Sequence, residues 1–244
     1  MLKEAIEYIQ KTAARPFIQE VDGHSYLIDK DCACGEIYPD LFPPETMELQ
    51  SLDALVKLVR TEATEDDAPI YITIPTHLQV KCFGQPDPEL RNQRKLYYYA
   101  VATDVPGWES GQMLGFEEMQ IALRTRFQET DDTVYALKLL SDITTGGKIT
   151  YNDNGVATSV VTQKGIALHQ NESIRPVVTL KPYRTFQEVD QPASPFLIRV
   201  SERGISFVEA DGSMWKLAAR KTIKAFLEEQ LQQEVGEGSV IVAL

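Results

Sequence analysis

Cysteine is scarce in this chain, and no long stretch of it is apolar throughout. Three cysteines, Cys32, Cys34 and Cys82, occur in 244 residues, and the first two are too close in sequence for a comfortable disulfide. We therefore expect a reducing compartment. No window approaches the roughly 20 apolar residues of a membrane span, and Glu4 and Glu7 interrupt the apolar run that a signal peptide needs. These absences predict a cytoplasmic protein with no membrane partner.

Basic side chains are also in the minority. Lysine and arginine total 24 against 36 aspartates and glutamates, which gives a formal net charge of −12. Because sequence-independent DNA binding depends on cations that displace counterions from phosphates, this balance argues against direct nucleic-acid binding. One alternative stays open, in which the acidic protein imitates nucleic acid and occupies a DNA-binding protein.

Motifs of common catalytic sites are missing as well. The sequence contains no GxSxG, GxxxxGK[ST], GxGxxG or HExxH, so it gives no support to nucleophile-elbow, P-loop, dinucleotide-binding or zinc-protease chemistry. Asp190, Glu209 and Asp211 are the candidates for Mg²⁺ ligands of a phosphodiesterase. The Glu-x-Lys pattern that usually accompanies such a site in nucleases does not occur. We expect no catalytic residue, no metal site and no cofactor.

Hydrophobic spacing predicts the elements of the first hundred residues. A helix is expected from Leu2 to Ala13, before Pro16, and Asp22-Gly23 favours a tight turn between two strands. A further helix, with Ser51 as its N-cap, is expected from Leu52 to Val59. The hairpin strands cover 17–21 and 24–28, an irregular stretch covers 30–46, later strands cover 70–74, 78–83 and 96–103, and a polar loop covers 84–95.

The rest of the chain predicts more hairpins and helices. A pair of helices is expected around Phe116–Phe127 and Val134–Leu140, followed by a hairpin around Asn154-Gly155 that sets Ile149 opposite Val160 and Tyr151 opposite Thr158. A strand is expected over 177–181, a hairpin over 196–201 and 205–210 that sets Val200 opposite Phe207, and a last helix over 217–232. The order of elements predicts an α+β fold, with a mainly antiparallel sheet built from hairpins and about five helices packed on it. We expect one domain over 1–244, with a possible N-terminal helix-hairpin subdomain over 1–46.

One segment, residues 180–216, concentrates the candidate binding residues. Tyr183, Arg184 and Glu188 could form a polar clamp for a ligand, or tie down a surface crossing in which Arg184 pairs with Glu188 if the segment is helical. Trp215 and the more distant Trp108 could be anchors for another protein or plugs beneath loops. We treat these five residues as candidates for a partner surface.

Parts of the chain resemble a family of uncharacterised phage and prophage proteins. The resemblance rests on the order of elements from Leu49 through Gln163, on the hairpin at Asp153-Asn154-Gly155, and on the segments PYRTFQEVDQP and EADGSMWK. It implies a cytoplasmic protein of an infected or lysogenic bacterium, often encoded near recombination genes, with no established activity to carry over. We therefore expect a non-enzymatic protein that binds another protein or itself. An acidic inhibitor of a host DNA-binding or defence protein and a metal-dependent phosphodiesterase are the alternatives.

Overall fold

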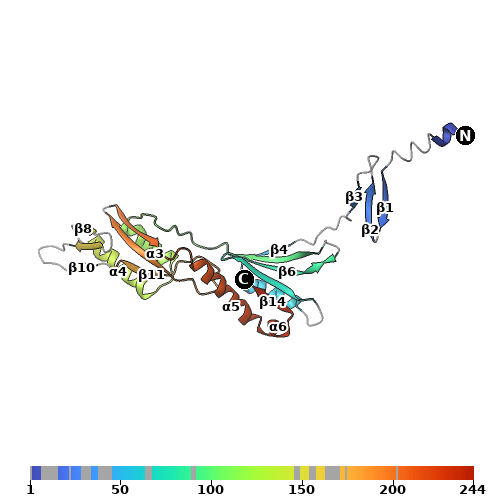
Figure 1. Ribbon diagram of the computed structural model, residues 1–244. Helices are drawn as coiled ribbons and strands as arrows, with labels where there is room; N and C mark the ends of the chain where they lie inside the picture. The colour runs from blue at the N-terminus through green and yellow to red at the C-terminus, as the bar shows by residue number, and fades with distance from the viewer. Residues whose placement is uncertain are drawn as a thin grey trace. The chain divides into compact units, whose positions relative to one another are not determined.

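The computed structural model describes residues 2–6, 16–21, 23–28, 34–37, 46–63, 68–88, 92–145, 149–153, 158–162, 171–173, 175–201 and 203–244. Contacts within the chain divide it into two units, Met1–Glu45 and Thr46–Leu244 (Figure 1). This division does not test the expectation of one domain over 1–244 with an N-terminal subdomain over 1–46, which stays a prediction. Across the described ranges, no helix is long and apolar enough to cross a membrane.

The N-terminal unit contains a three-stranded antiparallel sheet. Strands β1 (Phe17–Val21) and β2 (His24–Ile28) form the predicted hairpin, with Gly23 in its turn at φ +81°. Residues 2–6 are helical, whereas the rest of the predicted first helix lies outside the described residues. Strand β3 (Cys34–Ile37) pairs with β2, so the prediction that residues 30–46 are irregular throughout was wrong. Its pairing is made by the backbone, which composition does not reveal.

The second unit contains a five-stranded mixed sheet in the order β14-β5-β6-β7-β4. The central strands β5, β6 and β7 are antiparallel, but β14 runs parallel to β5 and β4 runs parallel to β7. The strands are β4 (Met47–Leu49), β5 (Ile70–Thr76), β6 (Gln79–Asp87), β7 (Gln93–Val101) and β14 (Val240–Ala243). The sequence analysis did not predict the edge strands β4 and β14, because each pairs with a segment that is distant in the chain.

The polar loop expected over 84–95 is largely strand. β6 and β7 continue to pair as far as Asp87 and Gln93, after irregularities near Phe83 and Pro86. The Arg94 guanidinium donates to the Gly84 carbonyl at 3.0 Å and lies over the Tyr71 ring, which holds the extended ends together. The prediction failed because polar side chains on a projecting hairpin resemble those of a loop.

Helices cover the apolar side of this sheet. α2 (Leu52–Glu62) begins at Ser51, whose hydroxyl accepts from the Ala54 N–H at 3.1 Å, as predicted. The last predicted helix, 217–232, corresponds to α5 (Trp215–Gln230), and a short further helix, α6 (Gln232–Glu237), follows after Leu231. Their buried side chains form the first core cluster with the sheet and with two residues of the segment 181–193, which has no helix or strand and which we call the 181–193 crossing. The members of this cluster include Leu55, Ile72, Tyr98, Phe186, Val189, Ile223 and Leu227.

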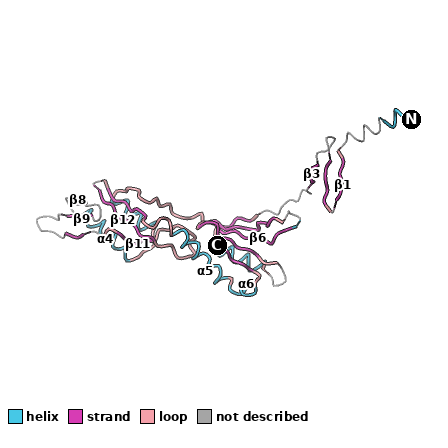
Figure 2. Tube along the Cα trace, in the orientation of Figure 1, coloured by secondary structure: helices cyan, strands magenta, loops and turns pink. Residues whose placement is uncertain are grey.

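A second core cluster lies under a smaller antiparallel sheet. Strands β11 (Val177–Leu180), β12 (Ser194–Ser201) and β13 (Gly204–Glu209) pack against α3 (Phe116–Arg126) and α4 (Asp131–Thr145). The cluster includes Met119, Leu123, Phe127, Leu140, Phe196 and Phe207. A long stretch without helix or strand joins β7 to α3 (Figure 2). The fold is α+β, with mostly antiparallel pairing spread over several sheets rather than one.

Two predicted registers were wrong by two residues. In β12–β13, Val200 lies opposite Ile205 and Phe207 lies opposite Ile198, because Gly204 already belongs to the strand and pairs with Ser201. In β8 (Ile149–Asp153) and β9 (Thr158–Thr162), Ile149 lies opposite Thr162 and Tyr151 opposite Val160. The connection is four residues long instead of two, and Asn154-Gly155 lies outside the described residues. β10 (Asn171–Ser173) completes that sheet.

The three consecutive tyrosines of β7 divide between the two faces of the sheet. Tyr98 is fully buried while Tyr97 and Tyr99 are partly exposed, as strand alternation predicts. The buried Tyr98 hydroxyl has no hydrogen-bond partner among the described residues, and burial raises the pKa of this phenol far above its usual value. An unpaired buried hydroxyl costs folding free energy.

Replacing Tyr98 by phenylalanine is therefore expected to keep the fold and to increase the free energy of unfolding by about 1 kcal/mol. Urea unfolding followed by circular dichroism measures the change. Tyr99→Phe is the matched control, since the Tyr99 hydroxyl donates to Glu48 at 2.6 Å on the partly exposed face. A loss of more than about 1 kcal/mol in Tyr98→Phe would mean that the buried hydroxyl has a partner.

Candidate partner-binding site

A buried arginine occupies the centre of the 180–216 segment. The Arg184 side chain is 8% exposed, and its guanidinium pairs with the Glu209 carboxylate and donates to the Ser194 hydroxyl at 2.8 Å. The guanidinium carbon, Cζ, lies 4.1 Å from the centroid of the Trp215 ring. Burial lowers the pKa of the guanidinium, and the neighbouring Glu209 opposes that shift. The suggested Arg184–Glu188 pair was wrong, because the segment is not helical and Arg184 turns toward β13.

The side chain of one glutamine, Gln191, holds the backbone of the 181–193 crossing around Arg184. The Gln191 side-chain carbonyl accepts from the Arg184 and Thr185 N–H groups, at 2.8 and 3.2 Å, and its amide donates to the Phe186 and Val189 carbonyls, at 2.9 and 3.3 Å. All four contacts fix backbone that has no strand or helix partner of its own. The polar side chains of this crossing therefore hold the chain, which leaves them little capacity to hold a ligand.

Three further predicted residues of the crossing have structural contacts elsewhere. The Glu188 carboxylate accepts from the Leu52 N–H at 2.7 Å and so satisfies a free donor at the start of α2. Asp190 forms an ion pair with Lys181 at 2.7 Å. Tyr183 is half-buried, and its N–H donates to the Arg126 carbonyl at 2.9 Å. These three residues do not join Arg184, Glu209, Ser194 and Trp215, which we call the Arg184 cluster.

Asp211 organises the turn before α5. One carboxylate oxygen accepts from the Ser194 hydroxyl at 2.9 Å and from the Trp215 N–H at 3.1 Å, and the other accepts from the Ser213 N–H at 3.0 Å. Gly212 and Ser213 are both left-handed, at φ +61° and +68°. A left-handed serine is uncommon, so this turn is held in shape by the three bonds to Asp211.

The three candidate metal ligands do not form a metal site. Glu209 pairs with Arg184, Asp211 accepts from three donors, and Asp190 pairs with Lys181. Within the described part of the chain there is no group of three or more His, Cys, Asp or Glu residues that could hold a metal ion. Cys82 is buried in the first core cluster and Cys34 is exposed on β3, while Cys32 lies outside the described residues.

His77 packs against the other side of this arrangement. Its ring meets the Trp215 ring edge to face at 4.7 Å, and its carbonyl accepts from the Thr185 hydroxyl. Burial lowers the pKa of His77 below its ordinary 6.5, and the charges of Lys216 and Arg184 lower it further. Because the unfolded chain then binds a proton more readily, this histidine reduces stability as the pH falls below about 6.5.

Beside Trp215 lies a groove of about 350 Å³. One wall is the start of α5 together with its N-cap, where Met214, Leu217, Ala218 and Lys221 follow helical spacing. The lining is completed by Ala193, Pro195, Asp211 and Trp215. Met214 is 64% exposed and Leu217 is 40% exposed. We call Met214, Leu217 and Ala218 the α5 stripe. It faces away from the buried positions Ile223 and Leu227 of the same helix.

Trp108, the remaining predicted anchor, belongs to the second core cluster. Its ring packs edge to face against Phe127 at 4.8 Å, and the neighbouring Gly107 carbonyl accepts from Arg126 at 3.0 Å. It belongs to the stretch that joins β7 to α3 and packs that stretch against the buried residues of the second core cluster. Sequence reasoning missed Met214 and Leu217, although their spacing beside Trp215 in EADGSMWKL was a usable signal.

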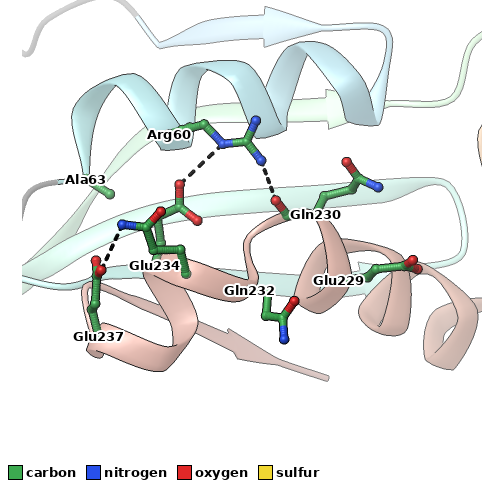
Figure 3. Close-up of a pocket in the computed structure, with 8 residues that line it drawn as sticks. Arg60, Ala63, Glu229, Gln230, Gln232, Glu234 and Glu237 are labelled. Atoms are coloured by element: carbon green, nitrogen blue, oxygen red, sulfur yellow. Dashed lines mark hydrogen bonds and ion pairs between the residues drawn. The ribbon is translucent and has the colours of Figure 1, made fainter.

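A larger and more polar cavity of about 710 Å³ lies where α2 meets the α5–α6 junction (Figure 3). The Arg60 guanidinium enters it from α2, contacts Glu234 at 3.3 Å and donates to the Gln230 carbonyl. The Gln233 amide donates to Glu237 at 2.9 Å. Because Arg60, the cation of its lining, is held by Glu234 and the Gln230 carbonyl, this cavity is best explained as the joint between α2 and the last two helices.

With the geometry of the molecule established, comparison with known proteins adds no relative: no protein-family model matches the chain, and no curated protein or solved structure matches it significantly.

Proposed function

We propose that this chain is a non-enzymatic interaction protein of phage or prophage origin, which works in the bacterial cytoplasm by binding another protein or a second copy of itself. The observation that carries the proposal is the α5 stripe, an exposed apolar surface beside the groove over Trp215. The suggested origin rests on the sequence resemblance alone, in the order of elements from Leu49 through Gln163, the hairpin at Asp153-Asn154-Gly155 and the segments PYRTFQEVDQP and EADGSMWK.

The α5 stripe is supported by a rigid base. Arg184 stacks on Trp215, Glu209 and Ser194 hold Arg184, and Asp211 fixes the turn that ends in Met214. Protein interfaces favour apolar anchors on surfaces that are ordered before the partner arrives, because less conformational freedom is then lost on binding. A methionine that is exposed on a fixed turn fits that requirement, since its flexible side chain adapts to a partner's shape.

The alternatives receive less support from the site. A phosphodiesterase needs carboxylates that are open to a metal ion, but Asp190, Glu209 and Asp211 are engaged by Lys181, Arg184 and the start of α5. An acidic inhibitor needs carboxylates gathered on one exposed face, and those of this site turn toward internal donors.

The proposal predicts that Met214→Asp with Leu217→Asp abolishes partner binding and leaves the fold intact. Each substitution places a carboxylate where an interface would be apolar, and loss of two central contacts is expected to weaken binding by about 30-fold or more. Quantitative mass spectrometry of proteins retained from bacterial lysate, together with mass photometry of the purified chain, measures the effect.

Ile121→Asp with Val134→Asp is the matched control, because both side chains are exposed apolar residues on α3 and α4. Retention should survive in the control and disappear in the α5 variant. A wild-type chain that is strictly monomeric and retains no protein above background would contradict the proposed function.

A further inference from the structure

A short stack of side chains connects the two core clusters. Among the described residues, no side chain belongs to both clusters, and the buried Trp215 belongs to neither. His77, in the turn between β5 and β6, meets the Trp215 ring edge to face at 4.7 Å. The Arg184 guanidinium carbon lies 4.1 Å from the Trp215 ring centroid and 5.6 Å from that of Phe196, a member of the second cluster. We call His77, Trp215, Arg184 and Phe196 the bridging stack.

The bridging stack lies where the chain passes between the two clusters. The turn from β13 to α5 leads from the second cluster to the first and ends at Trp215. The 181–193 crossing starts and ends at strands of the second cluster but contributes Phe186 and Val189 to the first, and it carries Arg184. A movement of one cluster relative to the other would therefore have to separate this stack.

The closed stack leaves two buried donors unsatisfied. The Arg184 Nε and the Trp215 Nε1 are both buried and have no hydrogen-bond partner in the described part of the chain. Two such donors fall within four side chains, whereas Tyr98 in the first cluster and Trp108 against the second hold one each. A buried donor without a partner costs folding free energy, which is recovered when water reaches it. Opening of the stack is therefore favoured over opening of either cluster.

The surroundings of His77 oppose its protonation. Burial, and then the positive charges of Lys216 on α5 and Arg184 on the crossing, lower the pKa of its ring below the ordinary 6.5. The carboxylates beside Arg184 are Glu209 and Asp211, whose charges act on that guanidinium. In an opened stack the ring meets water, so the open form binds a proton more readily than the closed form. A fall in pH through about 6.5 therefore favours opening.

We propose that the bridging stack is a pH-sensitive contact between the two core clusters: protonation of His77 separates its ring from Trp215, opens the stack and lets the clusters move relative to each other. The inference goes beyond the proposed function and does not depend on it. Because Trp215 also lines the groove beside the α5 stripe, opening changes one wall of that groove.

Hydrogen exchange of the full chain, measured by mass spectrometry, tests the opening. The reporters are the Arg184 and Trp215 N–H groups, which the Gln191 and Asp211 side chains hold beside the stack. After correction for the intrinsic effect of pH on exchange, their opening constant should rise about threefold or more between about pH 7.5 and about pH 5.5. Peptides from β6 and α4 should show no such rise, because both clusters stay folded.

Histidine variants assign the response. His77→Phe keeps a ring that can pack on Trp215 but takes up no proton, and His77→Gln removes the ring, so in both the opening constant should not change with pH. Lys216→Gln removes one cation that opposes protonation, and its rise should be smaller than that of the wild type. His24→Phe is the matched control, because the His24 ring contacts Glu36 in the N-terminal unit. It should respond as the wild type does.

Spin labels test the relative movement of the clusters. The background carries Cys32→Ser and Cys34→Ser, with the buried Cys82 unchanged. Labels are attached at Lys57→Cys on α2 and Lys138→Cys on α4, which are exposed positions. Pulsed electron paramagnetic resonance should give a narrow distance distribution at the higher pH that broadens at the lower pH. The two His77 variants should keep it narrow at both.

Every contrary result overturns the inference. A wild-type chain whose reporters do not respond to pH, or a response that survives in whichever His77 variant folds, excludes this histidine as the cause. A rise shared equally by the β6 and α4 peptides reports global unfolding. A distance distribution that is unchanged by pH shows that the clusters do not move. None of these results bears on the α5 stripe, whose variants test the proposed function separately.

Discussion

Arg184→Met is expected to lower the free energy of unfolding by about 3–5 kcal/mol, the cost of removing one partner of a buried ion pair. The substitution leaves the Glu209 carboxylate, 17% exposed, without its cation. It also removes the donor to Ser194 and the group that stacks on Trp215. Methionine keeps much of the arginine's volume, so the loss measures the charge and its hydrogen bonds more than a cavity. Urea unfolding monitored by tryptophan fluorescence gives the value.

Two further variants define this result. Lys181→Met breaks the ion pair with Asp190, in which both side chains reach solvent, and should cost less than about 1 kcal/mol. Adding Glu209→Gln to Arg184→Met should recover part of the loss, because the uncompensated buried charge is then removed. A single Arg184→Met variant as stable as wild type would show that the Arg184 cluster does not hold the 181–193 crossing in place.

Gly204→Ala is expected to cost about 3 kcal/mol or more and to disturb the second core cluster. Gly204 has φ +143°, a backbone conformation that residues with a side chain rarely adopt. A Cβ at this position would lie 2.0 Å from the Leu114 carbonyl oxygen. That carbonyl cannot move freely, because Leu114 and Ile205 exchange backbone hydrogen bonds of 2.9 and 3.0 Å. Thermal unfolding followed by near-ultraviolet circular dichroism measures the effect on packing.

Gly107→Ala is the comparison for this variant. A Cβ at Gly107 meets nothing within 4 Å, and its φ is not positive. We expect a change within about 1 kcal/mol, with a small gain possible from the stiffer unfolded chain. A Gly204→Ala variant as stable as Gly107→Ala would contradict the close contact between the Leu114 carbonyl and the start of β13.

Local patterns predicted local structure well in this chain. The helical spacing after Ser51 located α2 and its cap, and Asp22-Gly23 located the first hairpin. The failures came where a distant segment decides the outcome: β4 and β14 become strands because β7 and β5 offer free edges. The β12–β13 register depended on Gly204, whose conformation admits it to the strand and moves the turn by one position along the chain.

The candidate site was predicted in its residue types more than in its contacts. Arg184 and Trp215 were both singled out, and the structure stacks one on the other. Their remaining partners, Glu209, Asp211 and Ser194, lie 10 or more positions from Arg184 in sequence, so only the fold brings them together. Met214 was overlooked because the last helix was predicted to begin at Leu217, whereas α5 begins at Trp215 and has Met214 as its N-cap.

The parallel pairing of β14 with β5 has a consequence for synthesis on the ribosome. Val240 is made about 170 residues after Ile70, its neighbour in the sheet, which corresponds to about 10–30 s at a synthesis rate of about 5–20 residues per second. For that time one side of β5 lacks its strand, and the apolar positions Ile70, Ile72 and Ile74 lack part of their cover. Nascent chains with an open strand edge are targets for chaperones and for mispairing. The last four-residue strand therefore completes this sheet only after almost all the rest of it has been made.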